Sequence, residues 1–193
     1  RTKYMKIGAV LLCSGLSRRM ENKNKLLIKI DNKPMFQYNV DNVIRCDFDE
    51  IVAVTAYDEI EKYCLRKGIK TIRNSNSQLG QSQSIKLGTK ALYDMDAIAY
   101  FVCDQPFLSC NSIMKLKNNI QENGITVPVC EGNSYSPCIF SKKYFDLLLT
   151  LEGDKGGKSI IKNNTDYVNY VYFTDKKEFF LLLIKCIDIF FAA

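Results

Sequence analysis

Residues 9–20 read AVLLCSGLSRRM, and Lys25 follows shortly afterwards. The apolar run predicts a buried strand, and the small residues that end it predict a loop. Gly15 and its small neighbours let backbone N–H groups come close to an anion, and the basic residues that follow supply positive charge beside it. This segment alone fits either an anion-binding loop or an ordinary turn between a strand and a helix.

Outward from this segment, apolar runs that predict strands alternate with stretches of helical periodicity. This alternation predicts a three-layer, Rossmann-like α/β fold with a mostly parallel, mixed sheet, and 193 residues fit one domain over residues 1–193. The apolar residues 179–193 are too short to span a bilayer, and we expect them to pack as a terminal helix or strand. The expected extended segments are 7–13, 26–30, 51–55, 71–72, 97–103, 125–129 and 166–173, and the expected helices are 35–45, 57–67, 84–93, 109–123 and 141–151.

The composition restricts the chemistry. The chain contains no histidine, which excludes Ser-His-Asp and Cys-His catalysis and the usual zinc ligands. None of its eight cysteines has C-x-x-C spacing and no signal peptide is recognisable, so we expect reduced, buried thiols in a cytoplasmic protein. The net charge of +6 is spread along the chain, without the basic stripe and interleaved aromatics of a nucleic-acid-binding protein. It fits either a small polyanionic substrate or an ordinary lysine-rich surface.

Three later features carry further polar groups. The run NSNSQLGQSQS, residues 74–84, is either a solvated loop that caps a helix or a hydrogen-bonding surface for a base and a ribose. Asp104 follows the strand expected at 97–103, where ligands bind in open α/β sheets, although an aspartate there can also cap a helix. Asp154 lies in EGDKGGK, residues 152–158. This segment either supplies a further carboxylate to a site or is an ordinary helix end followed by a loop.

In combination, these motifs resemble the nucleotidyltransferases of the molybdenum cofactor pathway, and they are most similar to the molybdenum cofactor cytidylyltransferases. The family patterns are L-A-A-G-x-S-x-R-M-G-x-x-K, G-x-S-x-S-x-x-x-G, D-Q-P and G-D-x-G-[GA]-[RK]. They correspond here to residues 12–25, 80–88, 104–106 and 153–158. The resemblance implies the nucleotide-diphospho-sugar transferase fold. It also implies Mg²⁺-dependent transfer of CMP from CTP to the phosphate of a molybdopterin cofactor, with release of pyrophosphate.

The resemblance further implies roles for individual residues. Arg19, Lys25 and Asp104 are the expected catalytic residues, and Asp104 and Asp154 the expected ligands of Mg²⁺. A phosphate nucleophile is already anionic, so the reaction needs positioning and charge neutralisation more than a general base, and a chain without histidine can supply both. The expected nucleotide-binding residues are Leu12, Cys13, Ser14, Gly15, Arg19, Lys25, Ser82, Ser84 and Asp104.

Departures from the family patterns leave alternatives open. Glu21 stands where the family has glycine, and one extra residue separates Met20 from Lys25. Ser136 stands where relatives have a histidine near the acceptor, whereas Ser14 favours CTP. One alternative is guanylyl transfer, or a nucleotidyltransferase of sugar phosphates or other small-alcohol phosphates on the same fold. Another is a non-catalytic protein that binds a nucleotide or molybdopterin and hands the cofactor to a molybdoenzyme.

Overall fold

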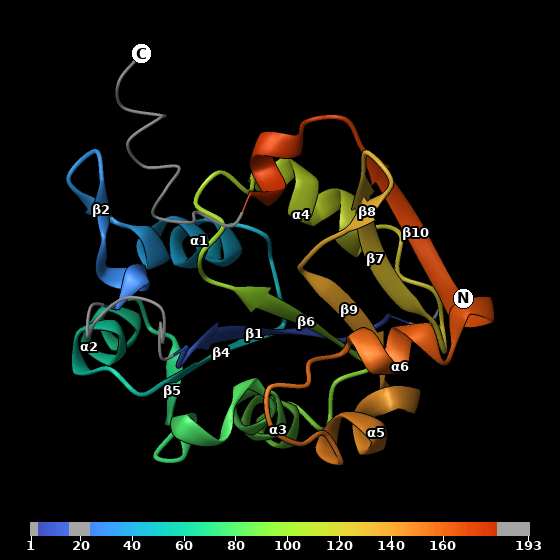
Figure 1. Cartoon of the computed structure of the whole chain (residues 1–193), viewed down its shortest axis with the longest axis horizontal. Coiled ribbons are helices and arrows are strands. Elements are labelled where there is room, and N and C mark those ends of the chain that lie inside the picture. Colours follow the sequence, from blue (N-terminus) through green and yellow to red (C-terminus); the bar gives the residue numbers. More distant parts are fainter. Residues whose placement is uncertain (1–3, 16–23, 181–193) are drawn as a thin grey trace.

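A mixed sheet of eight strands forms the centre of the computed structural model, which describes residues 4–15 and 24–180 (Figure 1). The spatial order of its strands is β10-β7-β9-β6-β1-β4-β5, and β8 pairs with β7. A separate hairpin pairs β2, Lys29–Ile30, with β3, Lys33–Pro34. The strands of the main sheet are β1 Ile7–Cys13, β4 Glu50–Thr55, β5 Lys70–Arg73, β6 Ala97–Val102, β7 Ile125–Cys130, β8 Asn133–Ser134, β9 Cys138–Ser141 and β10 Val168–Phe173.

Strand β1 lies in the interior of this sheet, in parallel register with β4 on one side and β6 on the other. Strand β9 runs antiparallel to both β6 and β7, and β10 runs parallel to β7. This arrangement confirms the predicted α/β fold with a mostly parallel sheet. Because β1, β4 and β6 end at the same edge, the loops that follow them are neighbours at that edge.

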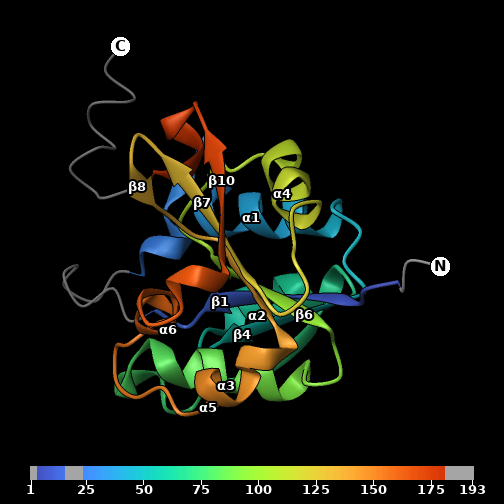
Figure 2. The same cartoon turned by 90° about the vertical axis from the view of Figure 1, so that its right-hand side faces the viewer.

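Helices cover both faces of the sheet, which makes three layers. Apolar side chains of α1, α2 and α4 pack on one face, and those of α3, α5 and α6 pack on the other. Figure 2 shows α1 and α4 on one side of the sheet and α3 and α5 on the opposite side. Ala9 and Leu11 of β1 belong to the first core and Val10 to the second, so this central strand needs apolar residues on both faces. The helices are α1 Met35–Ile44, α2 Asp58–Arg66, α3 Gln81–Ala91, α4 Cys110–Lys117, α5 Phe145–Leu149 and α6 Lys158–Lys162, with 3₁₀ turns at Lys25–Leu27, Ser77–Leu79, Lys142–Tyr144, Thr165–Tyr167 and Lys176–Phe179.

Several predicted boundaries were wrong. Helix α3 begins at Gln81, not at 84, so Ser82 and Ser84 lie in its first turn. Helix α4 ends at Lys117, well before the expected residue 123. Of the helix expected at 141–151, the first residue belongs to β9, and regular α-helix is confined to Phe145–Leu149. Phe179 is buried, whereas residues 181–193, the rest of the expected terminal element, lie outside the described residues. Within residues 4–15 and 24–180, every helix is too short or too polar to cross a bilayer.

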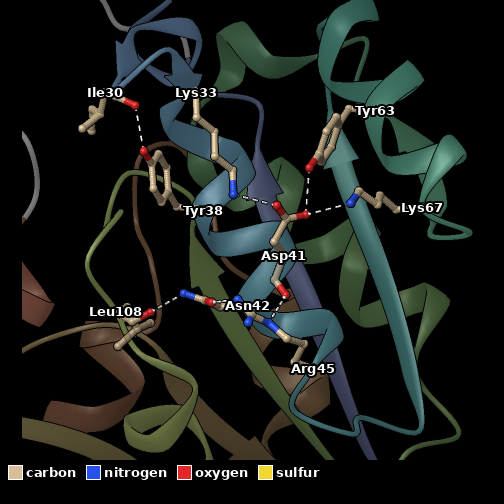
Figure 3. A network of polar contacts seen from close by, with 9 residues as sticks. All are labelled: Ile30, Lys33, Tyr38, Asp41, Asn42, Arg45, Tyr63, Lys67 and Leu108. Atoms are coloured by element: carbon tan, nitrogen blue, oxygen red, sulfur yellow. Dashed lines mark hydrogen bonds and ion pairs between the residues drawn. The ribbon is translucent and has the colours of Figure 1, made fainter.

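Helix α1 is tied to its surroundings by a network of polar contacts centred on Asp41 (Figure 3). The Asp41 carboxylate pairs with Lys33 of β3 at 2.7 Å and with Lys67 after α2 at 3.3 Å. The Tyr63 hydroxyl of α2 donates to the same carboxylate at 2.8 Å. On the next residue, Asn42 donates through Nδ2 to the carbonyl oxygen of Leu108 at 2.8 Å. Helix α1 therefore joins the β2–β3 hairpin and α2 to the loop that follows β6.

Candidate active site

A cavity of about 300 Å³ lies at the carboxyl ends of β1 and β6. Its wall combines residues from five parts of the chain that are far apart in the sequence: the end of β1, the turn at Lys25–Leu27, the segment at the start of α3, the end of β6 and the segment before α6. Arg19 lies outside the described residues, and Cys13 and Ser82 are not in the wall. The predicted site residues that line the cavity are Leu12, Ser14, Gly15, Lys25, Ser84, Asp104 and Asp154.

The loop after β1 presents backbone to this cavity. Among residues 4–15 and 24–180, no heavy atom lies within 4 Å of a Cβ added at Gly15, so these residues leave the backbone here open to an incoming ligand. The carbonyl oxygen of Gly15 accepts a hydrogen bond from the Tyr57 hydroxyl at 2.8 Å. The Ser14 hydroxyl donates to the carbonyl oxygen of Val54 at 3.1 Å, so towards the cavity it offers only lone pairs.

Two thiols lie side by side at the ends of β1 and β6. The sulfur atoms of Cys13 and Cys103 are 2.9 Å apart, and both residues are buried. The hydrogen bond to Cys103, and then burial, raise the pKa of the Cys13 thiol well above its ordinary value. Cys13 therefore acts as a small apolar residue of the core, and its contribution to a site is limited to its backbone. All seven cysteines within the described residues have free thiols.

Asp104 and Lys25 form an ion pair in the cavity wall. Asp104 follows soon after β6 and is 7% exposed. Lys25 begins a 3₁₀ turn. The side chain of Asn24 caps this turn by accepting a hydrogen bond from the backbone N–H of Leu26 at 3.0 Å. Lys25 contacts one carboxylate oxygen, Oδ2, and the other, Oδ1, is buried without a hydrogen-bond partner among the described residues. An orphaned carboxylate oxygen at a cavity is suited to bind a cation.

Asp154 reaches the cavity because two glycines allow two loops to touch. The backbone of Gly80 has a φ of +101° and a ψ of −179°, a conformation nearly confined to glycine. A Cβ added there would lie 2.4 Å from the carbonyl of Gly153 and 2.6 Å from Oδ1 of Asp154. The backbone N–H of Ser82 donates to the carbonyl oxygen of Gly153 at 3.1 Å. Ser82 therefore helps to hold the Asp154 loop, while its side chain is fully buried.

Comparison with known proteins identifies the family. The sequence model of the MobA-like NTP transferase domain matches residues 9–168. The chain belongs to this family.

Individual relatives agree with this assignment. The chain is 32% identical over 127 residues to 2-C-methyl-D-erythritol 4-phosphate cytidylyltransferase of Clostridium acetobutylicum, and the match covers 61% of this chain and 51% of that protein. It is 27% identical over 133 residues to the bifunctional protein GlmU of Shouchella clausii, covering 67% of this chain and 29% of that protein. The chain thus spans about half, or less, of the length of these relatives.

Solved structures share the fold. A complex of Rv0371c from Mycobacterium tuberculosis with manganese superposes with a TM-score of 0.75 at 17% identity, over 88% of this chain and 89% of that one. The fold is that of the nucleotide-diphospho-sugar transferases, as the sequence predicted. The MobA-like chain is therefore a nucleotidyltransferase domain by family, and it has the fold of these solved structures.

The donor set of this MobA-like site fits a hard divalent cation. No group of three or more histidine, cysteine, aspartate or glutamate residues that could hold a metal ion occurs in the part of the chain that the structure describes. Mg²⁺ is commonly held by one or two carboxylates together with substrate phosphates, so it does not require such a cluster. The unpartnered Oδ1 of Asp104 and the carboxylate of Asp154 in the same wall fit this pattern.

A smaller cavity of about 60 Å³ adjoins the first and shares Leu12, Gln81 and Val102 with it. Ser136 and Lys158 line it. The smaller cavity is therefore bordered by Ser136, which stands where the family motif has a histidine, and by Lys158, whose positive charge can face an anion.

Sequence reasoning missed several residues around the two cavities. Ser77, Gly80 and Gln81 line the larger cavity, and none of them is among the predicted site residues, although all three lie in the polar run of residues 74–84. The sequence shows Gln105 as part of the D-Q-P motif but predicts no role for it. Its buried side chain donates a hydrogen bond to the carbonyl oxygen of Ser136 at 3.0 Å. Gln105 thereby connects the loop of Asp104 to the smaller cavity.

Proposed function

We propose that this chain transfers CMP from CTP to the phosphate of a molybdopterin cofactor and releases pyrophosphate. The observation that supports the proposal is the single cavity that contains the Lys25–Asp104 pair, the Asp154 carboxylate and the open backbone at Gly15. The acceptor in this proposal rests on the motif resemblance, and nucleotidyl transfer rests on family membership.

The residues present supply what this reaction needs. The acceptor phosphate attacks the α-phosphorus of the nucleotide as an anion, and the bond from that phosphorus to the pyrophosphate oxygen breaks. Because no proton has to be removed from the nucleophile, catalysis depends on alignment and on stabilisation of charge. The ammonium of Lys25 is held at the cavity by Asp104, so a positive charge is in place before the triphosphate binds.

Each cavity residue then has a distinct part. The backbone at Gly15 lies where phosphate or nucleoside atoms can approach closely, since no side chain of the described residues stands there. Asp104 and Asp154 would hold Mg²⁺, which when bound supplies neutralisation of charge on the triphosphate. The smaller cavity with Lys158 and Ser136 is the neighbouring space in which an anionic acceptor would lie.

A second candidate is cytidylyl or uridylyl transfer to a sugar phosphate or a small-alcohol phosphate. The relatives favour this candidate, because one of them is a cytidylyltransferase of 2-C-methyl-D-erythritol 4-phosphate. Ser136, in place of the motif's histidine, also separates this chain from the molybdenum cofactor enzymes at the acceptor side.

The deciding experiment is a pyrophosphate-release assay with Mg²⁺, in which CTP, GTP, UTP and ATP are each combined with molybdopterin cofactor, with methylerythritol phosphate and with hexose 1-phosphates. The proposal expects release with CTP and molybdopterin cofactor. Release with GTP and molybdopterin identifies guanylyl transfer, and release only with an alcohol or sugar phosphate establishes the second candidate. Nucleotide or molybdopterin binding without any pyrophosphate release would instead indicate a carrier that delivers the cofactor to a molybdoenzyme.

A further inference from the structure

Ser84 is the one serine of α3 whose side chain lines the large cavity among the residues that the structure describes. It lies in the first turn of the helix and is 3% exposed. Its Oγ accepts a hydrogen bond from Nδ2 of Asn74 at 3.0 Å. Asn74 follows β5 and is itself buried, so this contact links the polar segment after β5 to the start of α3.

The orientation of the Asn74 carboxamide is fixed by its other contacts. Its Oδ1 accepts a hydrogen bond from the backbone N–H of Asn76 at 3.0 Å, and its own backbone N–H donates to the carbonyl oxygen of Thr55 at 2.9 Å. A rotation of the carboxamide by 180° would place NH₂ against the N–H of Asn76, donor against donor. Nδ2 must therefore face Ser84, and it can only donate.

This contact determines what the Ser84 hydroxyl offers to a ligand. A hydroxyl has one proton and two lone pairs, and Asn74 occupies one lone pair. Within residues 4–15 and 24–180, no acceptor for the Ser84 proton is found. The hydroxyl of Ser14, which follows β1, behaves differently because it already donates its proton to the carbonyl oxygen of Val54. The cavity wall thus presents one serine as a donor and one as an acceptor.

We infer that Ser84 donates a hydrogen bond to a carbonyl oxygen or ring nitrogen of the bound nucleoside, and that Asn74 is a positioning residue that sets this polarity. The inference rests on the proposed nucleotide-binding function of the cavity. The inference adds one chemical requirement to that function: the bound nucleoside must place a hydrogen-bond acceptor next to the Ser84 hydroxyl of α3.

The polarity can be reversed with little change in shape by Asn74→Asp. One carboxylate oxygen keeps the bond from the N–H of Asn76, and the other accepts the Ser84 proton and so removes the donor from the cavity. We expect the Kd for CTP with Mg²⁺, measured by isothermal titration calorimetry, to rise about tenfold, as for the loss of one hydrogen bond. The kcat for pyrophosphate release should stay within about twofold of wild type, since the triphosphate side is unaltered.

Three further variants separate polarity from charge and from folding. Ser84→Ala should weaken CTP binding by a similar factor, and the double variant should bind no more weakly than Ser84→Ala alone, because both changes remove the same bond. Asn76→Asp introduces the same charge on an exposed side chain two residues away and should bind CTP like the wild type. Melting temperatures report whether each variant is folded.

The outcomes distinguish this inference from the function on which it rests. Wild-type affinity in both Asn74→Asp and Ser84→Ala, additive losses in the double variant, or an equal loss in Asn76→Asp would each overturn the inference. Wild-type protein that binds CTP but never releases pyrophosphate would overturn the proposed activity and leave the binding comparison intact. Wild-type protein that binds no nucleoside triphosphate would overturn both.

Discussion

Replacing Gly80 by alanine should uncouple Asp154 from the cavity. The added Cβ would lie 2.4 Å from the carbonyl of Gly153, whereas ordinary contacts begin at 3.4 Å. The loop that carries Asp154 must therefore move by about 1 Å, and a misplacement of about 1 Å can cost about 100-fold in rate. The same substitution forces a residue with a Cβ into a glycine-only conformation, which costs about 1–3 kcal/mol.

The assay for Gly80→Ala is Mg²⁺-dependent pyrophosphate release, combined with the melting temperature. We expect a fall in kcat of about 100-fold and a higher Mg²⁺ requirement in a protein that is still folded at the assay temperature. Gly68→Ala is the matched control, because Gly68 also has a positive φ, of +76°, but an added Cβ there meets none of the described residues within 4 Å. It should lose stability and keep its rate. A folded Gly80→Ala protein with a rate within about threefold of wild type would refute the argument.

Three further substitutions test other parts of the structure. Gly15→Ala should leave the melting temperature unchanged, since the added Cβ has no neighbour within 4 Å in the part of the chain that the structure describes, and should weaken nucleotide binding in calorimetry; unchanged affinity would show that this backbone does not approach the ligand. Gly88→Ala places a Cβ 2.5 Å from Cγ1 of Val10, so chemical denaturation should show a loss of about 1–3 kcal/mol, and an unchanged midpoint would contradict the close packing of α3 on β1. Although burial alone would raise the pKa of Asp41, the hydrogen bonds from Lys33 and Tyr63 lower it below 3.8, so its contribution to stability is present above pH 3.8 and is lost as the pH falls through the native pKa. Asp41→Asn should accordingly lower the melting temperature at pH 7, and the difference from wild type should shrink below pH 3.8; a constant difference would exclude this linkage.

The features that sequence predicted well are those that depend on local patterns. The run before Cys13 has no polar alternation because β1 is covered on both faces, and this alone indicated a central parallel strand. Asp104 could be assigned to the ligand-binding edge because it follows a buried strand directly. By contrast, the start of α3 was misplaced because the unusual backbone at Gly80 allows the helix to begin immediately after it, and no periodic residue marks that point.

The contacts that complete the site were beyond sequence reasoning, because they depend on approach between distant segments. The polar run showed that hydroxyls and amides gather near residue 80, but not that Asn74 donates to Ser84 or that Ser82 is fully buried and does not line the cavity. The sequence shows the motif around Asp154. Only the close approach of the Gly80 and Gly153 backbones explains how the Asp154 carboxylate comes to line the same cavity as Asp104. The helix expected to continue to residue 123 ends at Lys117, although apolar Ile120 continues the periodicity. Beyond it, the carbonyl oxygen of Asn119 accepts hydrogen bonds from the distant side chains of Asn169 and Thr126, which sequence periodicity does not reveal.

The most direct test of the account follows the α-phosphate itself. Wild-type protein and the Asp104→Asn variant are incubated with CTP labelled at the α-phosphorus, Mg²⁺ and molybdopterin cofactor, and the products are separated. We expect the label to appear joined to the acceptor with wild-type protein and to remain in CTP with folded Asp104→Asn. Label transfer at equal rates by both proteins, or no transfer by the wild type to any phosphorylated acceptor, would contradict nucleotidyl transfer at this cavity.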